Sequence, residues 1–555
     1  MPGAVNTAFV LDMQRKLYRW SSSDPDKVFA DLFNLVCDRR TLNDAWRRLI
    51  RNRGSRTPGT DGVTRRTVEE RPGGAAGFLD EIREELRCGT YRPEPVRQRL
   101  IPKPGKVGKV RPLGIPTLTD RLVQMALKLI LEPIFEADFY PTSYGFRKGR
   151  STHDALAKIQ RSLHPTRGGL SVYGHVIEGD IKGCFDAIDH HVLMERVRRH
   201  VSDRKVLRLI LAFLKAGVMI EGTVRHPVTG SPQGGIVSPM LSNIYLTALD
   251  ERYGRWSLRP RERPQNAADR RFYDRSRGRP IFFMVRYADD FVVLVAGTRE
   301  QAEAERHALA AFLKEKLRMD LSMEKTRITD VRGGLDFLGY RVAQTKALQT
   351  KRWVGNLFIP KGKLNDLRYK IKALVKATPT GDSLASLIDR LNPILTGWRN
   401  YYRYATWACR DFNKLDNWIW WRVGRWLRKK HRKAYWRQLR RRLLATFAGT
   451  DSAGSMDPRA CGSSGKAEPC AFPTGAYVYR TDGMPSQTNS SVPELISSGQ
   501  PSTPSAPSEG HRRRQPYTES RMLGNLHVRF GERGGETWLR EGLKRFIPTL
   551  RCFGW

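Results

Sequence analysis

The chain has 555 residues, which is more than one compact domain usually contains, so two or more domains are expected. Its 98 Lys and Arg residues exceed its 56 Asp and Glu residues by a formal charge of +42, which favours a nucleic-acid partner over a merely solvated basic face. Seven scattered cysteines without a CxxC pair argue against a disulfide framework or a thiolate zinc site, and we find no secretory signal and no membrane-spanning stretch.

The N-terminal half predicts a helical start followed by a mixed region. Residues 26–55 are basic and helical in pattern, a turn-rich segment follows at 58–62, and a Gly/Ala-rich joint is expected at 72–77. From about 90 to 342, apolar segments bounded by turn residues alternate with amphipathic helices, which predicts an α+β region. One helix should begin at the cap Thr117, with these apolar residues on one face: Leu122, Ala126, Leu129 and Ile130.

Three segments of this region read as strands. One covers 176–181, and two others, 282–287 and 291–295, are separated only by Ala288-Asp289-Asp290. That spacing predicts a tight hairpin with two carboxylates at its tip.

After about 350 the pattern changes to basic helices. Apolar stripes at helical spacing predict two of them, one with Leu364, Leu367, Ile371 and Leu374, the other with Leu384, Leu387, Ile388, Leu391, Leu395, Trp398 and Tyr402. Pro393 is expected to bend the second helix. From 451 onward Ser, Gly, Pro and Thr dominate without a period, which predicts a disordered tail.

Asp180 and Asp289 are the candidate catalytic residues. Phosphoryl transfer to a primer 3′-hydroxyl needs two divalent metals about 3.5–4 Å apart, and hard Mg²⁺ prefers carboxylate oxygens. A strand end at Asp180 and a hairpin tip with Asp289 and Asp290 would bring such carboxylates together. Each feature alone is ordinary, because an Asp-Asp pair in a turn is usually solvated or capping.

The sequence around these aspartates narrows the choice. In chain order stand these blocks: Ile101-Pro102-Lys103-Pro104-Gly105, Arg111-Pro112-Leu113-Gly114-Ile115-Pro116, Asp120-Arg121-Leu122-Val123-Gln124, Gly179-Asp180-Ile181-Lys182-Gly183-Cys184-Phe185-Asp186, Ser231-Pro232-Gln233-Gly234-Gly235, Arg286-Tyr287-Ala288-Asp289-Asp290, Lys325-Thr326-Arg327 and Leu335-Asp336-Phe337-Leu338-Gly339-Tyr340. The ordered set, from about 40 to 445, resembles the group II intron-encoded reverse transcriptases/maturases. No single block is specific, but the order of all of them is.

The resemblance implies the roles of the carboxylates. Asp180 and Asp289 would ligate two Mg²⁺ ions, with the backbone carbonyl of Ile181 assisting and Asp290 as a third, more structural carboxylate. The reaction would extend a DNA or RNA primer by one deoxynucleotide on an RNA template and release pyrophosphate. Positioning and metal electrostatics would supply most of the rate.

The resemblance also implies a nucleotide site. Phe185 stands where the family places the side chain that crowds a ribose 2′-hydroxyl, although a core aromatic would give the same pattern. Lys103 and Arg111 would clamp the triphosphate, Gln233 and Gly234 would line the nucleotide and template, where a missing side chain permits close backbone approach, and Lys325 matches a position near the triphosphate. The two lysines and Arg111 would otherwise be solvated surface charges.

A basic, aromatic segment predicts RNA binding near the C-terminal end of the helical unit. Residues 422–442 contain eleven Lys or Arg and no Asp or Glu, among several tryptophans. The alternative is that the tryptophans form a core and the charges face water. The segment Thr396 to Tyr402 resembles the hallmark of the family's maturase (X, or thumb) domain, which implies binding of the parent intron RNA. The candidate RNA-binding residues are Arg399, Arg425, Arg428, Lys429, Lys430, Arg432 and Lys433, whereas Trp398 and Tyr402 are expected to pack.

The fold implied is an α+β right-hand polymerase with an all-α thumb. Its parts are an N-terminal basic helical extension leading into the fingers (1–75), fingers and palm (76–345), the thumb or maturase X domain (350–445) and a disordered tail (446–555). The function implied is an RNA-directed DNA polymerase, a nucleotidyltransferase, that also assists splicing and retrohoming of its intron. Its partners would be intron RNA, RNA template with DNA primer, a DNA target and dNTPs, in a bacterial cytoplasm.

Three questions are left open by the sequence. The histidines and cysteines after 450 are too widely spaced for a His-Asn-His site, so we expect no endonuclease and a primer from elsewhere, such as a nascent strand at a replication fork. We hypothesise that the reading frame after about 450 overlaps the ribozyme, because permissible codons for 519–530 form a hairpin that resembles intron domain V. The alternatives in function are a splicing-only maturase and a domesticated retron or phage-defence reverse transcriptase.

Overall fold

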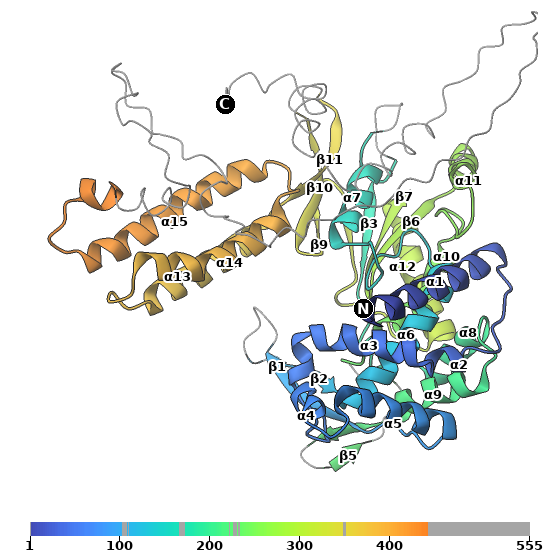
Figure 1. Cartoon of the computed structure of the whole chain (residues 1–555). Coiled ribbons are helices and arrows are strands. Elements are labelled where there is room, and N and C mark those ends of the chain that lie inside the picture. The colour runs from blue at the N-terminus through green and yellow to red at the C-terminus, as the bar shows by residue number, and fades with distance from the viewer. Residues whose placement is uncertain are drawn as a thin grey trace, which may run out of the picture. The chain divides into compact units, whose positions relative to one another are not determined.

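The structure, a computed structural model, describes residues 2–102, 108, 110–165, 172–220, 223–225, 230, 234–347 and 351–441. All of them belong to the first of two compact units, Met1–Thr481. Helices and sheets are mixed from the N-terminus to about 360, and three helices follow (Figure 1). The α+β prediction is therefore confirmed at this level. The predictions about the tail fall outside the described residues.

The N-terminal region contains more helices than predicted, with different bounds. They are α1 (Pro2–Ser23), α2 (Phe33–Val36), α3 (Arg39–Arg51), the 3-10 turn η1 (Arg53–Arg56), α4 (Arg65–Glu69) and α5 (Gly74–Cys88). The helical pattern over 26–55 corresponds to α2, α3 and η1 rather than to the whole range, and Asp38, which is extended and accepts from Arg40 N, caps α3 between them. The joint at 72–77 was wrong, because α5 starts inside it and buries Phe78, Leu79 and Ile82.

Helix α1 falls within the helical extension predicted for 1–75, although its bounds were not predicted, and it packs on α6 (Leu118–Glu136) and α3. Val10 and Leu17 are buried. The Gln14 side chain donates to the Leu129 carbonyl at 2.8 Å, and the Ser21 hydroxyl donates to the Ile134 carbonyl at 2.9 Å. Few side chains of α1 reach the core, so the helix has only a weak apolar face. Its stability therefore comes from these tertiary contacts.

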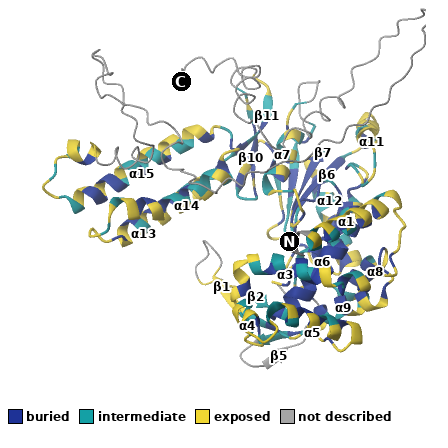
Figure 2. Ribbon diagram, viewed as in Figure 1, coloured by how far each residue is buried: buried dark blue, intermediate teal, exposed yellow. Residues whose placement is uncertain are grey.

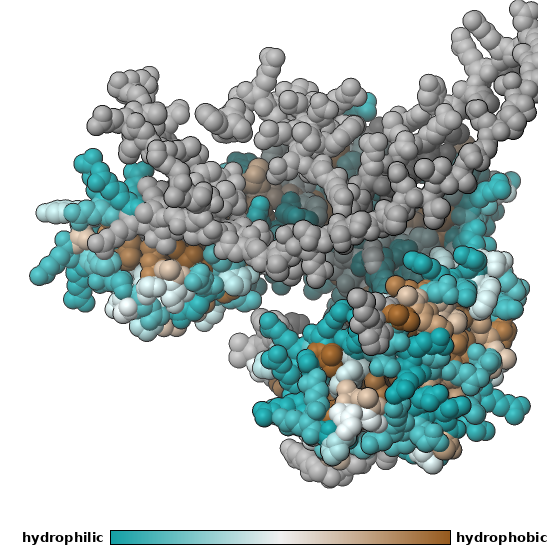
Figure 3. All heavy atoms as spheres, viewed as in Figure 1, coloured by the Kyte–Doolittle hydropathy of each residue, from teal (hydrophilic) through white to brown (hydrophobic). Residues whose placement is uncertain are grey.

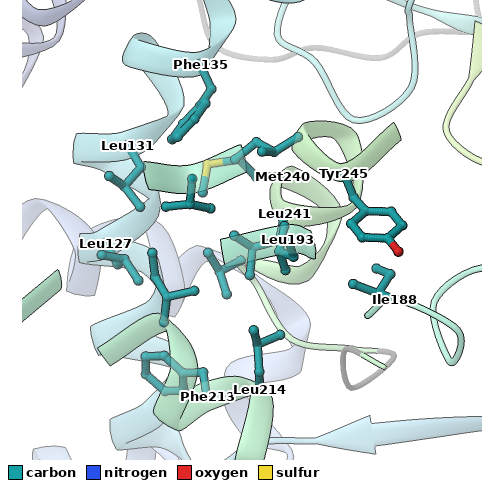
Figure 4. Packing of buried hydrophobic residues seen from close by; sticks show 14 of the residues in the cluster. Leu127, Leu131, Phe135, Ile188, Leu193, Phe213, Leu214, Met240, Leu241 and Tyr245 are labelled. Atoms are coloured by element: carbon teal, nitrogen blue, oxygen red, sulfur yellow. The ribbon is translucent and has the colours of Figure 1, made fainter. Parts of the chain in front are cut away.

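Helix α6 begins as predicted. The Thr117 side chain accepts a hydrogen bond from Asp120 N at 3.1 Å and is the N-cap. Its apolar face meets α8 (His190–Arg198), α9 (Arg204–Lys215) and α10 (Ser238–Arg252) in the largest hydrophobic core. Figure 4 shows this packing, with Leu127 and Leu131 of α6 close to Met240 and Phe213.

A first sheet of four strands adjoins this helical region. Its order is β2-β1-β4-β5, with β1 and β2 antiparallel and β1 and β4 parallel. The bounds are β1 Val96–Pro102, β2 Val110–Ile115, β4 Val218–Ile220 and β5 Thr223–Arg225. Much of β1 and β2 is exposed, so this sheet presents a surface rather than a core.

The second sheet carries the predicted strands. Its order is β6-β7-β3-β8, all antiparallel, with β3 at His175–Gly179, β6 at Ile281–Tyr287, β7 at Asp290–Ala296 and β8 at Arg327–Asp330. The hairpin prediction is confirmed, because Tyr287 pairs with Asp290 around the turn. The strand predicted at 176–181 ends earlier, since Asp180 leaves the ladder and Ile181 pairs instead with Leu321. The β6 and β7 interiors are buried (Figure 2).

Three helices surround this sheet: α7 (Thr152–Ser162), α11 (Pro264–Ser276) and α12 (Arg299–Leu317). Helices α7 and α11 both pack against β6, and α12 packs against β3 and β8. Buried residues of α7 and of the strands form a second hydrophobic cluster, including Leu156, Ile159, Phe283 and Leu294. Phe283 pairs with Leu294 away from the turn of Asp289, so this cluster anchors the sheet toward the other end of β6 and β7.

A small sheet joins this region to the C-terminal helices. Its order is β11-β10-β9, with β9 at Leu335–Phe337, β10 at Tyr340–Lys346 and β11 at Trp353–Phe358, followed by α13 (Lys361–Ala377), α14 (Leu384–Tyr402) and α15 (Ala408–Lys430). The Tyr401 hydroxyl donates to the Leu338 carbonyl at 2.6 Å, and Tyr402 donates to Gly339 at 3.1 Å. Both predicted helical stripes are confirmed, and α14 continues through Pro393.

Candidate active site

Three carboxylates meet at one end of the β6-β7-β3-β8 sheet. Gly179 pairs with Phe291, so the next residue, Asp180, emerges beside Asp290, the first residue of β7. Asp289 lies in the two-residue turn between β6 and β7. Side chains directly opposite in an antiparallel pair have Cβ atoms about 4.5–5.5 Å apart. The sheet register therefore brings together the carboxylates that the sequence motifs singled out.

The electrostatics of Asp290 confirm that these groups face one another. The pKa of Asp290 is raised to about 6: displacement of water by the surrounding protein and the carboxylates of Asp289 and Asp180 raise it, and Arg111 lowers it. The Asp290 side chain is nevertheless solvent-accessible, so the like charges are the more telling cause. Arg111 of β2 thus lies within electrostatic reach of the carboxylates, as the nucleotide-clamp prediction requires.

Lys325 contacts one of the candidate metal ligands. Its Nζ donates to Asp180 Oδ2 at 2.8 Å, and this bond raises the pKa of Lys325. Both side chains retain access to solvent, with 67% of Lys325 and 38% of Asp180 exposed. The ammonium therefore sits where a cation bound to Asp180 would also have to sit.

The carboxylates fit a divalent metal in chemistry, but they do not form a closed cage. Within the described ranges, no group of three His, Cys, Asp or Glu side chains is arranged to hold a metal by itself. Hard oxygen donors from Asp180 and Asp289, left partly open, are what a metal shared with substrate phosphates needs. The backbone of Ile181 is held by its pairing with Leu321.

The turn that carries Asp289 is held by a buried network that the sequence motifs did not reveal. Arg286 is completely buried and pairs with Asp250 of α10. Its NH1 group donates to the Ala288 carbonyl and to Asn243 Oδ1, both at 3.0 Å. Arginine at the end of β6 thereby ties the turn to α10.

A second strand-like contact completes this network. Arg286 N donates to the Thr142 carbonyl, and Tyr144 N donates to the Arg286 carbonyl, both at 2.9 Å. Asn243 Nδ2 donates to the Gly145 carbonyl at 2.8 Å. The sequence pattern gives little indication of Asn243 and Asp250. Both are single polar residues on a helix that is otherwise buried on all sides, so no periodic pattern points to them.

Two glycines permit the close packing around the aspartates. A Cβ on Gly145 would stand 2.2 Å from the backbone nitrogen of Ala288. A Cβ on Gly179 would stand 2.1 Å from the ring of Phe291, which is almost fully buried. Real Cβ atoms do not approach so closely, so both positions require the absence of a side chain. The glycine before Asp180 is therefore part of the site.

Gly234 marks the loop predicted to lie under the nucleotide and template. Its φ is +121°, and a Cβ there would stand 2.1 Å from the Gly114 carbonyl of β2. The next turn is held by Gln124 of α6, whose Oε1 accepts from Ile236 N at 2.7 Å. Gln124 thus supports the loop that follows Gly234. The motif Asp120 to Gln124 contained this residue, but the sequence did not reveal its role. Lys103 and Gln233 fall outside the described residues.

Phe185 lies on the turn between β3 and α8 and is half-buried. Its neighbours Cys184 and Ile188 belong to the main hydrophobic core, and burial, followed by the Asp289 charge, raises the pKa of the Cys184 thiol to about 12. Among the described residues, Phe185 is neither a member of that core nor one of the side chains packed on it. This placement favours the nucleotide-facing interpretation over the core aromatic.

The basic C-terminal helix has an apolar inner face and a cationic outer face. Val423, Trp426 and Leu427 are buried, while Trp421 is 48% exposed and stacks on Trp436 at 5.5 Å between ring centroids. Several tryptophans therefore do form a core, as the alternative held. The predicted RNA-binding residues that are exposed on or after this helix are Arg425, Arg428, Lys429, Arg432 and Lys433. Hydrophilic residues are prominent on this unit in Figure 3.

Two residues predicted to bind RNA also contact other parts of the protein. Lys430 Nζ donates to the carbonyls of Thr380 and Asp382 at 3.0 and 2.7 Å, which ties α15 to the α13–α14 loop. Burial raises the pKa of Asp416 on α15, and the charge of nearby Arg399 opposes this shift without outweighing it. Both side chains therefore have structural roles, whatever else they contact. The rings of Trp398 and Tyr402 pack against each other, as expected, with 4.7 Å between their centroids.

Comparison with known proteins identifies two regions of the chain. Residues 101–342 match the family described as Reverse transcriptase (RNA-dependent DNA polymerase), and residues 364–444 match the family described as Group II intron, maturase-specific domain. Protein YkfC of Escherichia coli K12 is 38% identical over 379 residues, which cover 66% of this chain and 96% of YkfC. The chain belongs to the group II intron-encoded reverse transcriptase/maturase family.

Other relatives of this reverse transcriptase/maturase carry intron names. Group II intron-encoded protein LtrA of Lactococcus lactis is 35% identical over 375 residues, or 60% of each chain. An uncharacterized 91 kDa protein in the cob intron of Schizosaccharomyces pombe is 29% identical over 434 residues, or 67% of this chain and 52% of the relative. The chain thus spans only about half to three fifths of these two relatives.

Membership assigns this reverse transcriptase/maturase its enzyme class, RNA-directed DNA polymerase, with a second region of the kind that assists splicing. Polymerases of this class use divalent metal ions. Among the described helices, none combines the length and apolar character that crossing a membrane requires.

Proposed function

We propose that this reverse transcriptase copies its parent group II intron RNA into DNA, with Asp180 and Asp289 as the metal ligands, and that it also helps the same RNA to splice. The single observation that carries the assignment of residues is the sheet register, which places Asp180 beside the turn of Asp289 and Asp290. The raised pKa of Asp290 supports it, because the other two carboxylates contribute to that shift.

The chemistry proposed is one nucleotide addition. The primer 3′-oxygen forms a bond to the α-phosphorus of a dNTP, the bond from that phosphorus to the bridging oxygen breaks, and pyrophosphate leaves while the hydroxyl proton passes to solvent. Arg111 would hold the triphosphate, and Lys325, released from Asp180, would neutralise charge on it. Lys103 and Gln233 stay predicted members of this nucleotide site.

Two Mg²⁺ ions are the proposed cofactors. When bound, they would lower the pKa of the primer hydroxyl and stabilise the leaving pyrophosphate. Asp180 and Asp289 would supply oxygen ligands, the Ile181 carbonyl would add one, and Asp290 would act as the outer carboxylate. Because the protein offers few ligands of its own, substrate phosphates and water would have to complete both shells.

The regions would correspond to the parts of a right-hand polymerase. The fingers would begin in the N-terminal extension (1–75) and include the exposed β1–β2 sheet, and the palm would be the sheet with the carboxylates. These two sheets lie in the region 76–345. Helices α13–α15 would form the thumb or maturase domain (350–445). The exposed cations of α15 are the proposed contacts to intron RNA. An RNA template with DNA primer and a DNA target are the further partners proposed, in a bacterial cytoplasm.

A splicing-only maturase would have no reason to retain the active-site geometry. The buried Arg286 network and the close approaches at Gly145 and Gly179 hold the aspartates in one arrangement. This observation favours a working polymerase. A retron or phage-defence enzyme would share the polymerase site, but the match to the maturase-specific domain favours an intron partner.

Primer extension on an RNA template tests the polymerase assignment. Wild type with Mg²⁺ is expected to extend a DNA primer, and Asp289→Asn should lose at least about 10³-fold in rate, since one charge of a two-metal site is removed. The variant should bind RNA transcribed from the DNA that flanks the gene with the same affinity as wild type. Wild-type protein without Mg²⁺-dependent extension, or an active Asp289→Asn variant, would contradict the proposal.

A further inference from the structure

A cationic surface lies between α7 and α11, on the sheet that carries the aspartates. Lys158 and Arg161 come from α7, and Arg271 and Arg275 come from α11; these four residues are the α7–α11 basic surface. Both helices pack against β6 (Figure 1). The Lys158 side chain is exposed, but the protein around it displaces water and lowers its pKa, and the charges of Arg271 and Arg161 lower it further. These three cations therefore lie within electrostatic reach of one another, and Arg275 lies one turn beyond Arg271 on α11.

No acidic residue of these helices neutralises the surface. Helices α7 and α11 contain three carboxylates, and each has another partner: Asp154 accepts from Ser151 at 2.8 Å, Asp269 from Gln265 at 2.9 Å, and Asp274 from Arg255 at 2.7 Å. Within the described part of the chain, none of the four cations is bonded to a carboxylate within 4 Å. Like charges held together without counter-charges favour a polyanionic ligand.

Aromatic rings stand exposed beside these cations. Phe272, 72% exposed, lies on the side of α11 opposite to the buried Asp274, and Arg275 is one turn away. Tyr273 is 44% exposed, and the Arg277 guanidinium lies over its ring at 4.1 Å. A phenylalanine that faces water is not needed for packing. Arg271 donates to the Trp256 carbonyl at 2.7 Å but has no carboxylate partner. Flat rings next to guanidinium groups without a carboxylate partner match the chemistry that stacks unpaired bases and binds their phosphates.

The surface is remote from the catalytic carboxylates. Helix α11 ends just before Ile281, the first residue of β6, whereas the turn with Asp289 follows Tyr287, its last residue. A strand of this length spans about 20 Å. Lys158 Nζ lies over the ring of Phe283, near the α11 end of the strand. A ligand of this surface is therefore neither the incoming nucleotide nor the paired primer end.

We propose that the α7–α11 basic surface, together with Phe272, binds a single-stranded segment of RNA outside the polymerase cleft. The guanidinium and ammonium groups would pair with successive phosphates, and Phe272 would stack on an unpaired base. The inference rests on the proposed function for the source of that RNA, the long intron transcript, most of which lies outside the cleft at any moment. Nucleotide addition on a short template does not require the surface.

Charge removal is the first test. Lys158→Gln/Arg275→Gln removes two exposed cations, and the control Arg66→Gln/Arg299→Gln removes two exposed arginines that each pair with a glutamate four residues on. With a single-stranded RNA of about 60 nucleotides, the first variant should bind about 10-fold more weakly at about 0.15 M salt, with a salt slope smaller by roughly 1.4. The control should stay within about 3-fold of wild type, and both should extend a short template–primer at the wild-type rate.

Stacking is tested separately. Phe272→Ala should weaken binding of the same single-stranded RNA by about 5- to 20-fold and leave binding of a fully paired RNA duplex unchanged, while Phe272→Trp should restore it. Because the ring is mostly in water, neither change should lower the melting temperature.

Three results would overturn the assignment. They are unchanged RNA affinity in the two test variants, a loss no larger than in the control pair, and an equal loss for single-stranded DNA of the same sequence. The inference fails separately from the proposed function: wild type would then still extend primers and bind the intron transcript. Conversely, wild type could show no preference for the intron transcript while the test variants bind single-stranded RNA more weakly. That result would support the RNA-binding surface and contradict the intron RNA as its partner.

Discussion

Arg286 donates hydrogen bonds to both carboxylate oxygens of Asp250, at 3.0 and 2.5 Å, and neither side chain is exposed to solvent. The same guanidinium donates to the Ala288 carbonyl, one residue before Asp289. A buried pair of this kind gives little net stability, because desolvation opposes the attraction. Its contribution is geometric: it determines where the turn with Asp289 stands relative to α10.

Breaking this pair should impair both stability and catalysis. Asp250→Asn leaves an uncompensated buried guanidinium, which costs about 3–5 kcal/mol, and Arg286→Lys loses the donor to Ala288. We expect a lower melting temperature for both and a fall in kcat beyond what unfolding explains, measured at a temperature where each variant is folded. The surface pair Arg299–Glu303 is the control, for which removal should cost under about 1 kcal/mol.

A double substitution separates the two roles. Arg286→Met/Asp250→Leu removes both charges, so it should recover much of the stability lost in the single variants. If it also recovered kcat, the pair would not hold the turn and the positioning role would be wrong.

Gly234→Ala should damage substrate use more than stability. The new Cβ would meet the Gly114 carbonyl at 2.1 Å with φ at +121°, so the loop has to move. We expect kcat/KM for dNTP to fall at least about 10-fold, a change of about 1.4 kcal/mol. Gly62→Ala is matched, because its φ is +72° but nothing lies within 4 Å of its Cβ. Equal kinetics for the two variants would show that the Gly234 contact is irrelevant.

Phe185→Ala tests the sugar gate. If the ring excludes a ribose 2′-hydroxyl, its loss should raise ribonucleotide relative to deoxynucleotide incorporation by about 10-fold or more, read from single-nucleotide additions. Phe9→Ala provides a control, since Phe9 is also half-buried but lies on α1 and packs against the main hydrophobic core. Unchanged selectivity in Phe185→Ala would support the core-aromatic alternative.

His200 makes stability depend on pH. Its Nδ1 faces the Lys27 carbonyl at 3.1 Å and its Nε2 faces the Asp138 carboxylate, so both nitrogens need protons. Burial alone would lower its pKa, but the bond and charge of Asp138 outweigh it, and the pKa is raised. The stabilisation is therefore complete below about pH 6.5, the value of a free histidine, and is lost as pH rises through the higher native pKa.

Urea unfolding from about pH 5.5 to 8.5 measures this effect. The difference in unfolding free energy between wild type and His200→Gln should be largest at the acidic end and shrink toward the alkaline end. Asp138→Asn should flatten the curve in the same way. A difference that grows with pH would mean that His200 is neutral in the folded protein.

Much of the fold followed from local pattern. The Thr117 cap, the stripes of α13 and α14 and the hairpin around Asp289 were predicted because their signals lie within one turn or one strand pair. The bounds of helix α1 were not predicted within the helical extension, because its stability comes from distant residues of α6, such as Leu129 and Ile134, which accept its hydrogen bonds.

The sequence by itself determined the chemistry at the two aspartates. Motif order identified Asp180 and Asp289 as a pair, because a two-metal site restricts residue type and local spacing. Only the tertiary structure decided what holds them. Arg286, Asp250 and Asn243 are far apart in the chain and carry no shared pattern, yet burial obliges each to find a partner. The α7–α11 basic surface arose in the same way, from two helices that meet only on the folded sheet.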